Sequence, residues 1–192
     1  MEKSDKSRFR RSGAGNIEFL PVNRQDMEAR GWKELDILLI SGDAYVDHPT
    51  FAIPLLGRLL ESRGYRVGII AQPDWRDPAS VTVMGRPRLF CGVGAGGLDS
   101  MLSHYTAFRK IRHQDAFSPG GKAGLRPNRA AIVYSNLVRS AFPGLPLAIG
   151  GIEASLRRLT HYDFWSDSLR RSILLDSKAD ILMYGMGEHA IL

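Results

Sequence analysis

Thiols and long apolar runs are scarce in this sequence. Its 192 residues include a single cysteine, Cys91, which excludes an internal disulfide and any iron-sulfur or zinc site built from several thiolates of this chain. No stretch of about 18 uncharged apolar residues occurs, so the sequence predicts no membrane-spanning helix. The basic first residues are followed by no apolar segment, which is unlike a secretory signal. We therefore expect a cytoplasmic protein that does not insert into membranes.

The remaining composition is that of a globular domain. Apolar residues make up 44% of the chain and charged residues 24%, which is enough for one hydrophobic core and unlike collagen-like, disordered or coiled-coil sequences. The net charge is +6. Part of it lies in residues 1–18, where we expect a basic, disordered tail. The tail is predicted to precede one α/β domain at residues 19–192.

Short apolar runs alternate with segments of helical character along the chain. The runs are typical of strands buried on both faces, and they lie at residues 35–40, 66–71, 88–93, 146–149 and 180–184. Helices are predicted at residues 24–30, 50–63, 78–84, 99–105, 127–142 and 164–176. This alternation favours an α/β fold with an open, doubly wound, mainly parallel sheet of about five strands.

Polar residues follow the first predicted strand. In open parallel sheets, ligands bind beyond the carboxyl ends of the strands, which is where Asp43, Asp47 and His48 lie. Carboxylates and an imidazole at this position can hold a metal, orient a hydroxylated ligand or share a proton. The alternative is structural, with Asp47 capping the next helix and Asp43 accepting hydrogen bonds from turn amides.

Glycines and a few polar residues follow the fourth and fifth predicted strands. A glycine pair lets a ligand lie against the backbone, and neighbouring carboxylates or hydroxyls can hydrogen-bond it. The ligand-binding candidates in these loops are Gly150, Gly151, Glu153, Ser155, Gly185 and Glu188. We predict that the three loops form one crevice, and a plain strand-to-helix turn is the alternative for each.

Other motifs are weaker. Residues 92–97 match the glycine spacing of a dinucleotide-binding loop, but they follow the third strand, so a tight turn before a helix capped by Asp99 is favoured. Cys91 is predicted to be a small buried hydrophobic residue. The histidines show no metal-ligand spacing, so the sequence predicts no metal site.

A basic stretch supports a second interpretation. Residues 106–127 have no periodicity, and unstructured segments of this length are usually functional or disordered. The basic residues of this region are Arg109, Lys110, Arg112, Lys122, Arg126 and Arg129. Asp115 is the one acidic residue between them. Such a cluster suits phosphates and predicts nucleic-acid binding as an alternative function. The aromatic segment 161–167 fits either a platform for bases or the end of a helix packed into the core.

Several strings of the sequence resemble one known family. They are GDAYVDHP at residues 42–49, RVGIIAQPDW at 66–75, DSM at 99–101, RKIRH at 109–113, GGIEASLRR at 150–158, HYDFWSD at 161–167 and RRSILLDSKAD at 170–180. Together they are similar to the YgiQ family of bacterial radical S-adenosylmethionine (SAM) proteins. The resemblance extends from about residue 19 to residue 192.

The resemblance implies an N-terminal α/β region, laid out like cobalamin-binding and other Rossmann-like domains, followed by a radical SAM barrel. In that family, a C-x-x-x-C-x-x-C motif of the barrel binds a [4Fe-4S] cluster and S-adenosylmethionine. This chain has one cysteine. We therefore expect it to be the N-terminal portion of a longer enzyme, with the barrel as its partner and no cofactor or catalytic residue of its own. Its expected role is to help bind the substrate or a second cofactor.

Cobalamin is a further alternative within this interpretation. Domains that bind cobalt through histidine use the pattern D-x-H-x-x-G, which Asp47, His48 and Pro49 do not match. The resemblance therefore leaves open only cobalamin binding without a histidine ligand.

Overall fold

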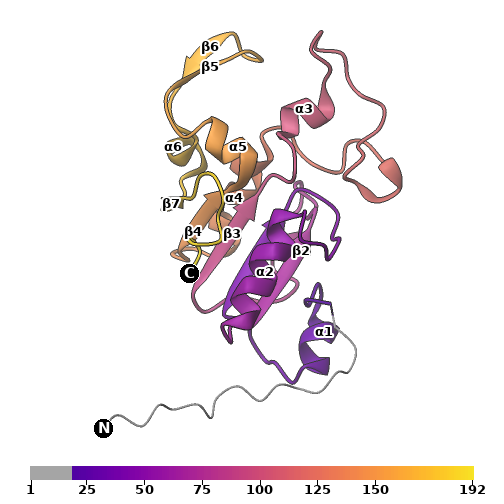
Figure 1. Cartoon of the computed structure of the whole chain (residues 1–192), viewed down its shortest axis with the longest axis vertical. Helices are drawn as coiled ribbons and strands as arrows, with labels where there is room; N and C mark the ends of the chain where they lie inside the picture. The colour runs from indigo at the N-terminus through magenta and orange to yellow at the C-terminus, as the bar shows by residue number, and fades with distance from the viewer. Residues whose placement is uncertain (1–18) are drawn as a thin grey trace.

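A parallel five-stranded sheet forms the centre of the domain in the computed structural model, which describes residues 19–192 (Figure 1). Its strands run in the order β2-β1-β3-β4-β7, and every neighbouring pair is parallel. Their bounds are β1 Ile37–Ser41, β2 Val67–Ala71, β3 Phe90–Gly94, β4 Leu147–Gly150 and β7 Ile181–Leu182. The predicted α/β fold is confirmed. The tail predicted at residues 1–18 lies outside the described residues.

Short helices connect these strands. The α-helices are α1 Arg24–Ala29, α2 Ala52–Ser62, α3 Ser100–His104, α4 Ala130–Ala141, α5 Gly151–Leu156 and α6 Ile173–Ser177. Two 3-10 segments, η1 Pro78–Val81 and η2 Pro119–Gly121, lie in the connections before β3 and before α4. No helix within residues 19–192 is long and apolar enough to cross a membrane.

The two faces of the sheet are covered by different elements. One face packs against α4 and η1 in the larger apolar cluster, which includes Cys91, Ile149 and Tyr134. The other face packs against α2 in a smaller cluster that includes Leu39, Leu60 and Ile69. All five residues of β1 are buried, as its continuous apolar run predicts.

Helices α1 and α2 begin in different ways. Asn23 caps α1, because its side-chain oxygen accepts a hydrogen bond from the backbone N–H of Asp26 at 2.9 Å. Helix α2 begins after Phe51 without any side-chain cap, so the alternative in which Asp47 caps it is wrong. Pro54 lies in the first turn of α2, where its missing N–H costs no hydrogen bond.

The helix predicted at residues 164–176 is wrong. This region contains an antiparallel hairpin of β5 (His161–Asp163) and β6 (Ser168–Arg170), and only then the short helix α6. Asp167 has a positive φ of 50°, which a helix does not allow, and the hydroxyl of Ser166 donates to the buried Asp163 carboxylate inside the turn. Local polar bonds therefore override the helical spacing of the apolar residues.

The hairpin tip contacts the long irregular segment that follows α3. The rings of Trp165 and Tyr105 lie 5.2 Å apart, and the guanidinium of Arg109 donates to the carbonyl of Phe164 at 2.6 Å. The aromatic residues thus pack against this segment rather than at the end of a helix. Figure 1 shows the hairpin and the segment extending past the same end of the sheet.

Candidate functional site

The strand order defines where a ligand site is expected. The chain leaves β1 toward β2 on one side of the sheet, and it leaves β3 toward β4 on the other side. Open sheets of this kind bind ligands where the direction reverses, at the carboxyl ends of the two central strands. Here the loops after β1 and β3 touch, since the N–H of Gly42 donates to the carbonyl of Gly94 at 2.9 Å.

A small, mostly apolar cavity lies at this place, between the sheet and α2. It leaves about 50 Å³ for the centres of water-sized spheres, which is room for a few water molecules. Its floor is mostly backbone, at Gly92 and Gly94 of β3, Ala148 and Gly150 of β4, and Gly151 at the start of α5. The side chains of Phe51, Ile53 and Leu56 line it from the α2 side, and Asp43 and Tyr45 line it from the first loop.

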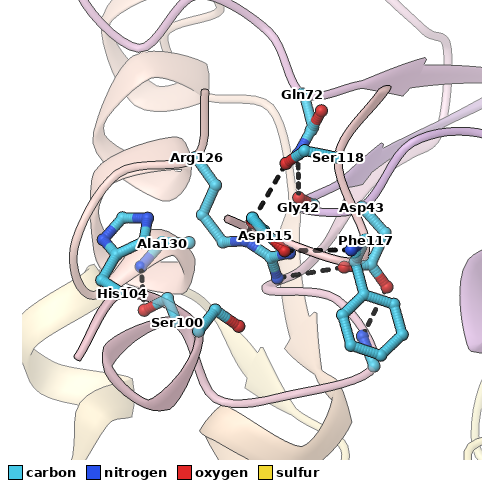
Figure 2. Close-up of polar contacts among 12 residues, drawn as sticks. Gly42, Asp43, Gln72, Ser100, His104, Asp115, Phe117, Ser118, Arg126 and Ala130 are labelled. Atoms are coloured by element: carbon cyan, nitrogen blue, oxygen red, sulfur yellow. Dashed lines mark hydrogen bonds and ion pairs between the residues drawn. The ribbon is translucent and has the colours of Figure 1, made fainter. Parts of the chain in front are cut away.

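Asp43 belongs to a buried ionic cluster beside the cavity. The side chain of Arg126 is 0% exposed and donates from Nε and Nη2 to the carboxylate of Asp115 at 2.9–3.1 Å. Its Nη1 donates to the carbonyl of Ala95 at 3.0 Å and lies 3.0 Å from Oδ1 of Asp43. Figure 2 shows the guanidinium between the two carboxylates. One buried cation therefore serves two buried acids.

The electrostatics of Asp43 follow from this shortage of positive charge. Burial raises the pKa of its carboxyl group, although the N–H of Gly97 and the guanidinium of Arg126 lower it. Oδ2 accepts the Gly97 hydrogen bond at 2.6 Å. Among the described residues, Oδ1 has no partner with hydrogen-bond geometry. Asp43 thus brings to the cavity lining a buried carboxylate whose second oxygen lies only in an ion pair with Arg126.

The long segment after α3 is held over this edge by further polar contacts. Nε2 of Gln72 donates to the carbonyl of Gly42 at 3.0 Å and to the Ser118 hydroxyl at 2.7 Å. That hydroxyl in turn donates to Asp115 at 3.0 Å. Figure 2 shows these bonds meeting at the Arg126 cluster. The sequence marked Asp115 only as the one acid in the basic stretch, and it gave no signal for Gln72.

The structure separates Asp47 and His48 from the cavity. Asp47 forms a salt bridge with Arg58 of α2, outside the cavity lining. His48 is exposed, and its Nδ1 lies 2.9 Å from the hydroxyl of Thr50. Of the three polar residues predicted in the first loop, only Asp43 lines the cavity.

Glu153 is buried and bound by its own protein. Its carboxylate accepts hydrogen bonds from the N–H and hydroxyl of Ser100 and from the N–H of Ala131, at 2.5–3.0 Å. These bonds join the starts of α3, α4 and α5. The contacts give Glu153 a structural role at this edge, behind the cavity.

The remaining predicted residues fall into two groups. Gly150 and Gly151 line the cavity beside Asp43, and their contact with a ligand stays a prediction. Ser155 accepts a hydrogen bond from the N–H of Gly185 at 3.1 Å, and Glu188 follows on the segment after β7, outside the cavity lining.

Most of the predicted nucleic-acid candidates are engaged within the domain. Arg126 is buried, Arg129 forms a salt bridge with Asp163, and Arg112 donates to two backbone carbonyls. Arg109 donates to Phe164 and stacks over its ring. Lys110 and Lys122 are exposed. Arg109 and Arg112 are exposed as well, so the nucleic-acid interpretation now depends on these four cations and stays a prediction.

The donor set does not fit an iron-sulfur cluster. Such a cluster takes several thiolates, and the one cysteine, Cys91, is buried, so that burial raises the pKa of its thiol. Residues 19–192 also contain no group of three His, Cys, Asp or Glu side chains placed to hold a metal ion. No step of a cluster-dependent reaction is assigned to this chain.

Comparison with known proteins gives the family. A model of the radical SAM N-terminal family matches residues 19–192. The chain belongs to the radical SAM N-terminal family. This match confirms the resemblance found in the sequence.

Curated relatives of this radical SAM N-terminal domain are longer proteins. It is 58% identical to a UPF0313 protein of Thermotoga neapolitana and 59% identical to one of Thermotoga maritima, over 91% of this chain and 31% of each relative. It is 58% identical to a UPF0313 protein of Geobacter sulfurreducens, over 92% of this chain and 29% of that protein. The chain thus spans about three tenths of the length of these relatives. No solved structure matches it.

Proposed function

We propose that this radical SAM N-terminal domain is an accessory domain of a longer radical SAM enzyme and binds part of the substrate or a second cofactor. It performs no catalytic step of its own in this proposal. The [4Fe-4S] cluster and S-adenosylmethionine would belong to the remainder of that enzyme, because this chain lacks the thiolates for a cluster.

The observation that carries the proposal is the cavity at the reversal point of the sheet. Its walls are mostly apolar, its floor is mostly backbone, and the Asp43 carboxylate is the charged group in its lining. Pockets for whole small molecules usually measure about 300–1,000 Å³. A cavity of about 50 Å³ therefore suits one small apolar group of a larger ligand, with a hydroxyl or amine beside it.

The cavity also bears on the cobalamin alternative. A corrin ring is far larger than this space, and His48 lies outside the lining. Only a peripheral group of cobalamin would enter the cavity, without a histidine on cobalt. Cobalamin is therefore one of the probes in the test.

Ligand binding is tested with three variants of this chain. Gly94→Val fills the cavity, because a Cβ at Gly94 points at the side chain of Ile53, 3.1 Å away. Asp43→Asn removes the carboxylate, and Asp47→Asn changes a carboxylate outside the cavity. Each protein is incubated with a small-molecule extract or with aquacobalamin, and retained compounds are identified by native mass spectrometry.

We expect the unmodified chain and Asp47→Asn to retain the same compound. Gly94→Val should lose it, and Asp43→Asn should bind it about tenfold or more weakly, because a hydrogen bond to a charged group contributes about 1.5–3 kcal/mol. Retention by Gly94→Val, or no retained compound in the unmodified chain, would contradict the proposal. Binding of RNA or DNA that weakens steeply with salt would favour the nucleic-acid interpretation instead.

A further inference from the structure

Within residues 19–192, no helix covers one half of the sheet face that carries α2. We call this half the bare face and define it by Phe90 of β3, Ala148 of β4, and Ile181 of β7 with the adjacent Met183. Figure 1 shows α2 over the β2–β1 half, with the end of the chain beside β3 and β4. Ile181 is 60% exposed on the bare face, whereas Ile149 on the opposite face is 0% exposed beneath α4.

The bare face forms an apolar groove. Its volume is about 260 Å³, and its floor is formed by β3, β4 and β7. The lining residues include Leu89, Phe90, Pro146, Ala148, Ile181 and Ile191. A parallel sheet buries both faces in known folds, so an open groove of this kind requires an occupant.

The last residues of the chain already enter this groove. Ile191 lines it and also packs against the apolar cluster beneath α2. The N–H of Ile191 donates to the carbonyl of Gly187 at 3.0 Å, which is the i to i−4 spacing of an α-helix. One turn with this hydrogen-bond spacing, at residues 188–190, therefore lies beside the groove after β7.

Fold handedness indicates what this turn leads to. The α4 and α5–α6 connections, which lead from β3 to β4 and from β4 to β7, lie on the opposite face of the sheet. A right-handed connection on the α2 face would instead lead from β7 back toward β4. A new strand could not pair with β7 on that side, because β4 already does. The segment after β7 is thus placed to cover the sheet and not to extend it.

We propose that the bare face is the docking site for the segment that follows position 192 in the longer relatives, folded as a helix alongside α2. Those relatives have about two thirds of their length outside the matched region. The helix would cover Phe90, Ile181 and Met183, which are the partly or fully exposed residues of the bare face. The inference does not depend on ligand binding in the cavity.

The test uses the accessibility of an introduced thiol. Cys91 is buried, so Ile181→Cys provides the reactive thiol on the bare face. Labelling by a maleimide is compared between this chain and a chain extended after Leu192 by the next 20 or so residues of the Thermotoga maritima relative, about 30 Å of helix. Leu169→Cys on the exposed hairpin is the matched control.

We expect Ile181→Cys to be labelled at least about tenfold more slowly in the extended chain, with Leu169→Cys unchanged. A proline in the middle of the extension should restore fast labelling, because it breaks a helix. Equal rates for Ile181→Cys in the two chains would overturn the proposal. So would slow labelling in the unextended chain that becomes fast on dilution, because a second copy would then cover the face.

Hydrogen exchange on the full-length Thermotoga maritima relative gives an independent test. The amides aligned with residues 188–192 and about ten that follow should exchange slowly as one helix. Fast exchange throughout that stretch would overturn the proposal.

Discussion

The buried guanidinium of Arg126 leads to a prediction about stability. Its side chain has no exposure and lies between the carboxylates of Asp115 and Asp43, which are 1% and 5% exposed. Arg126→Met keeps a long unbranched side chain but removes the charge and all its hydrogen bonds. Two buried carboxylates then remain without their cation.

The magnitude follows from the cost of an unpaired buried charge. Removing one partner of a buried ion pair costs about 3–5 kcal/mol, and a whole domain is stable by only about 5–15 kcal/mol. With a urea m-value of about 2 kcal/mol per M, the unfolding midpoint should fall by about 1.5–2.5 M. Arg126→Lys keeps the charge but not the paired hydrogen bonds. Its unfolding midpoint should therefore fall by a smaller amount than that of Arg126→Met.

Urea unfolding followed by tryptophan fluorescence at pH 7 measures this effect. Arg24→Met is the control, because Arg24 and Glu28 form an exposed pair at 3.5 Å that contributes at most about 0.5 kcal/mol. At pH 5 the difference in unfolding midpoint between Arg126→Met and the unmodified chain should become smaller than at pH 7. Burial already raises the pKa of Asp43, and the variant removes the guanidinium that lowers it, so the folded variant takes up more protons than the unfolded chain and gains stability as the pH falls.

Two results would refute this reasoning. The first is a midpoint shift for Arg126→Met no larger than that of Arg24→Met. The second is a large midpoint shift for Arg126→Met that is equally large at pH 7 and pH 5. The loss of stability would then come from packing and not from unpaired charge.

Three further predictions concern single positions. Hydrogen bonds from Arg66 hold the pKa of Asp36 at about 2, below its usual 3.8. The free energy of unfolding should therefore decrease by about 2 kcal/mol through Asp36 as the pH falls from about 5 to 2. When stability is measured against pH, Asp36→Asn should lack this decrease. In Gly42→Ala the new Cβ would overlap the carbonyl oxygen of Ala95, so the free energy of unfolding should decrease by about 1–3 kcal/mol. An unchanged thermal unfolding midpoint would contradict this prediction. Because burial raises the pKa of the Cys91 thiol, a disulfide reagent should leave it unmodified in the folded protein and modify it in urea; reaction without urea would show that it is accessible.

Local patterns were sufficient to predict most of the fold. The five apolar runs coincide with the five strands of the main sheet, and their alternation with helices requires parallel pairing. The helix predicted at residues 164–176 failed because apolar spacing does not report the polar bonds of a turn, such as the one from Ser166 to Asp163. A hairpin tip held by contacts with a distant segment leaves no periodic signal.

The candidate site was predictable only in part. Placement at the carboxyl ends of the strands follows from the parallel sheet, and Gly150 and Asp43 line one cavity there. Glu153 and Asp47 were predicted beside them, but their carboxylates bind other parts of the protein. Sequence shows which residues follow a strand, whereas the direction of each side chain depends on its neighbours in space.

The sequence by itself determined the α/β class, the parallel sheet, the family and the inability of this chain to build a thiolate cluster. These properties depend on composition, on periodicity within short segments, or on strings of residues. Only the tertiary structure decided that Arg126 is a buried counter-ion and not a cation free for nucleic acid. Its partners Asp43 and Asp115 come from distant segments, and burial of a charge depends on which segments the fold brings together.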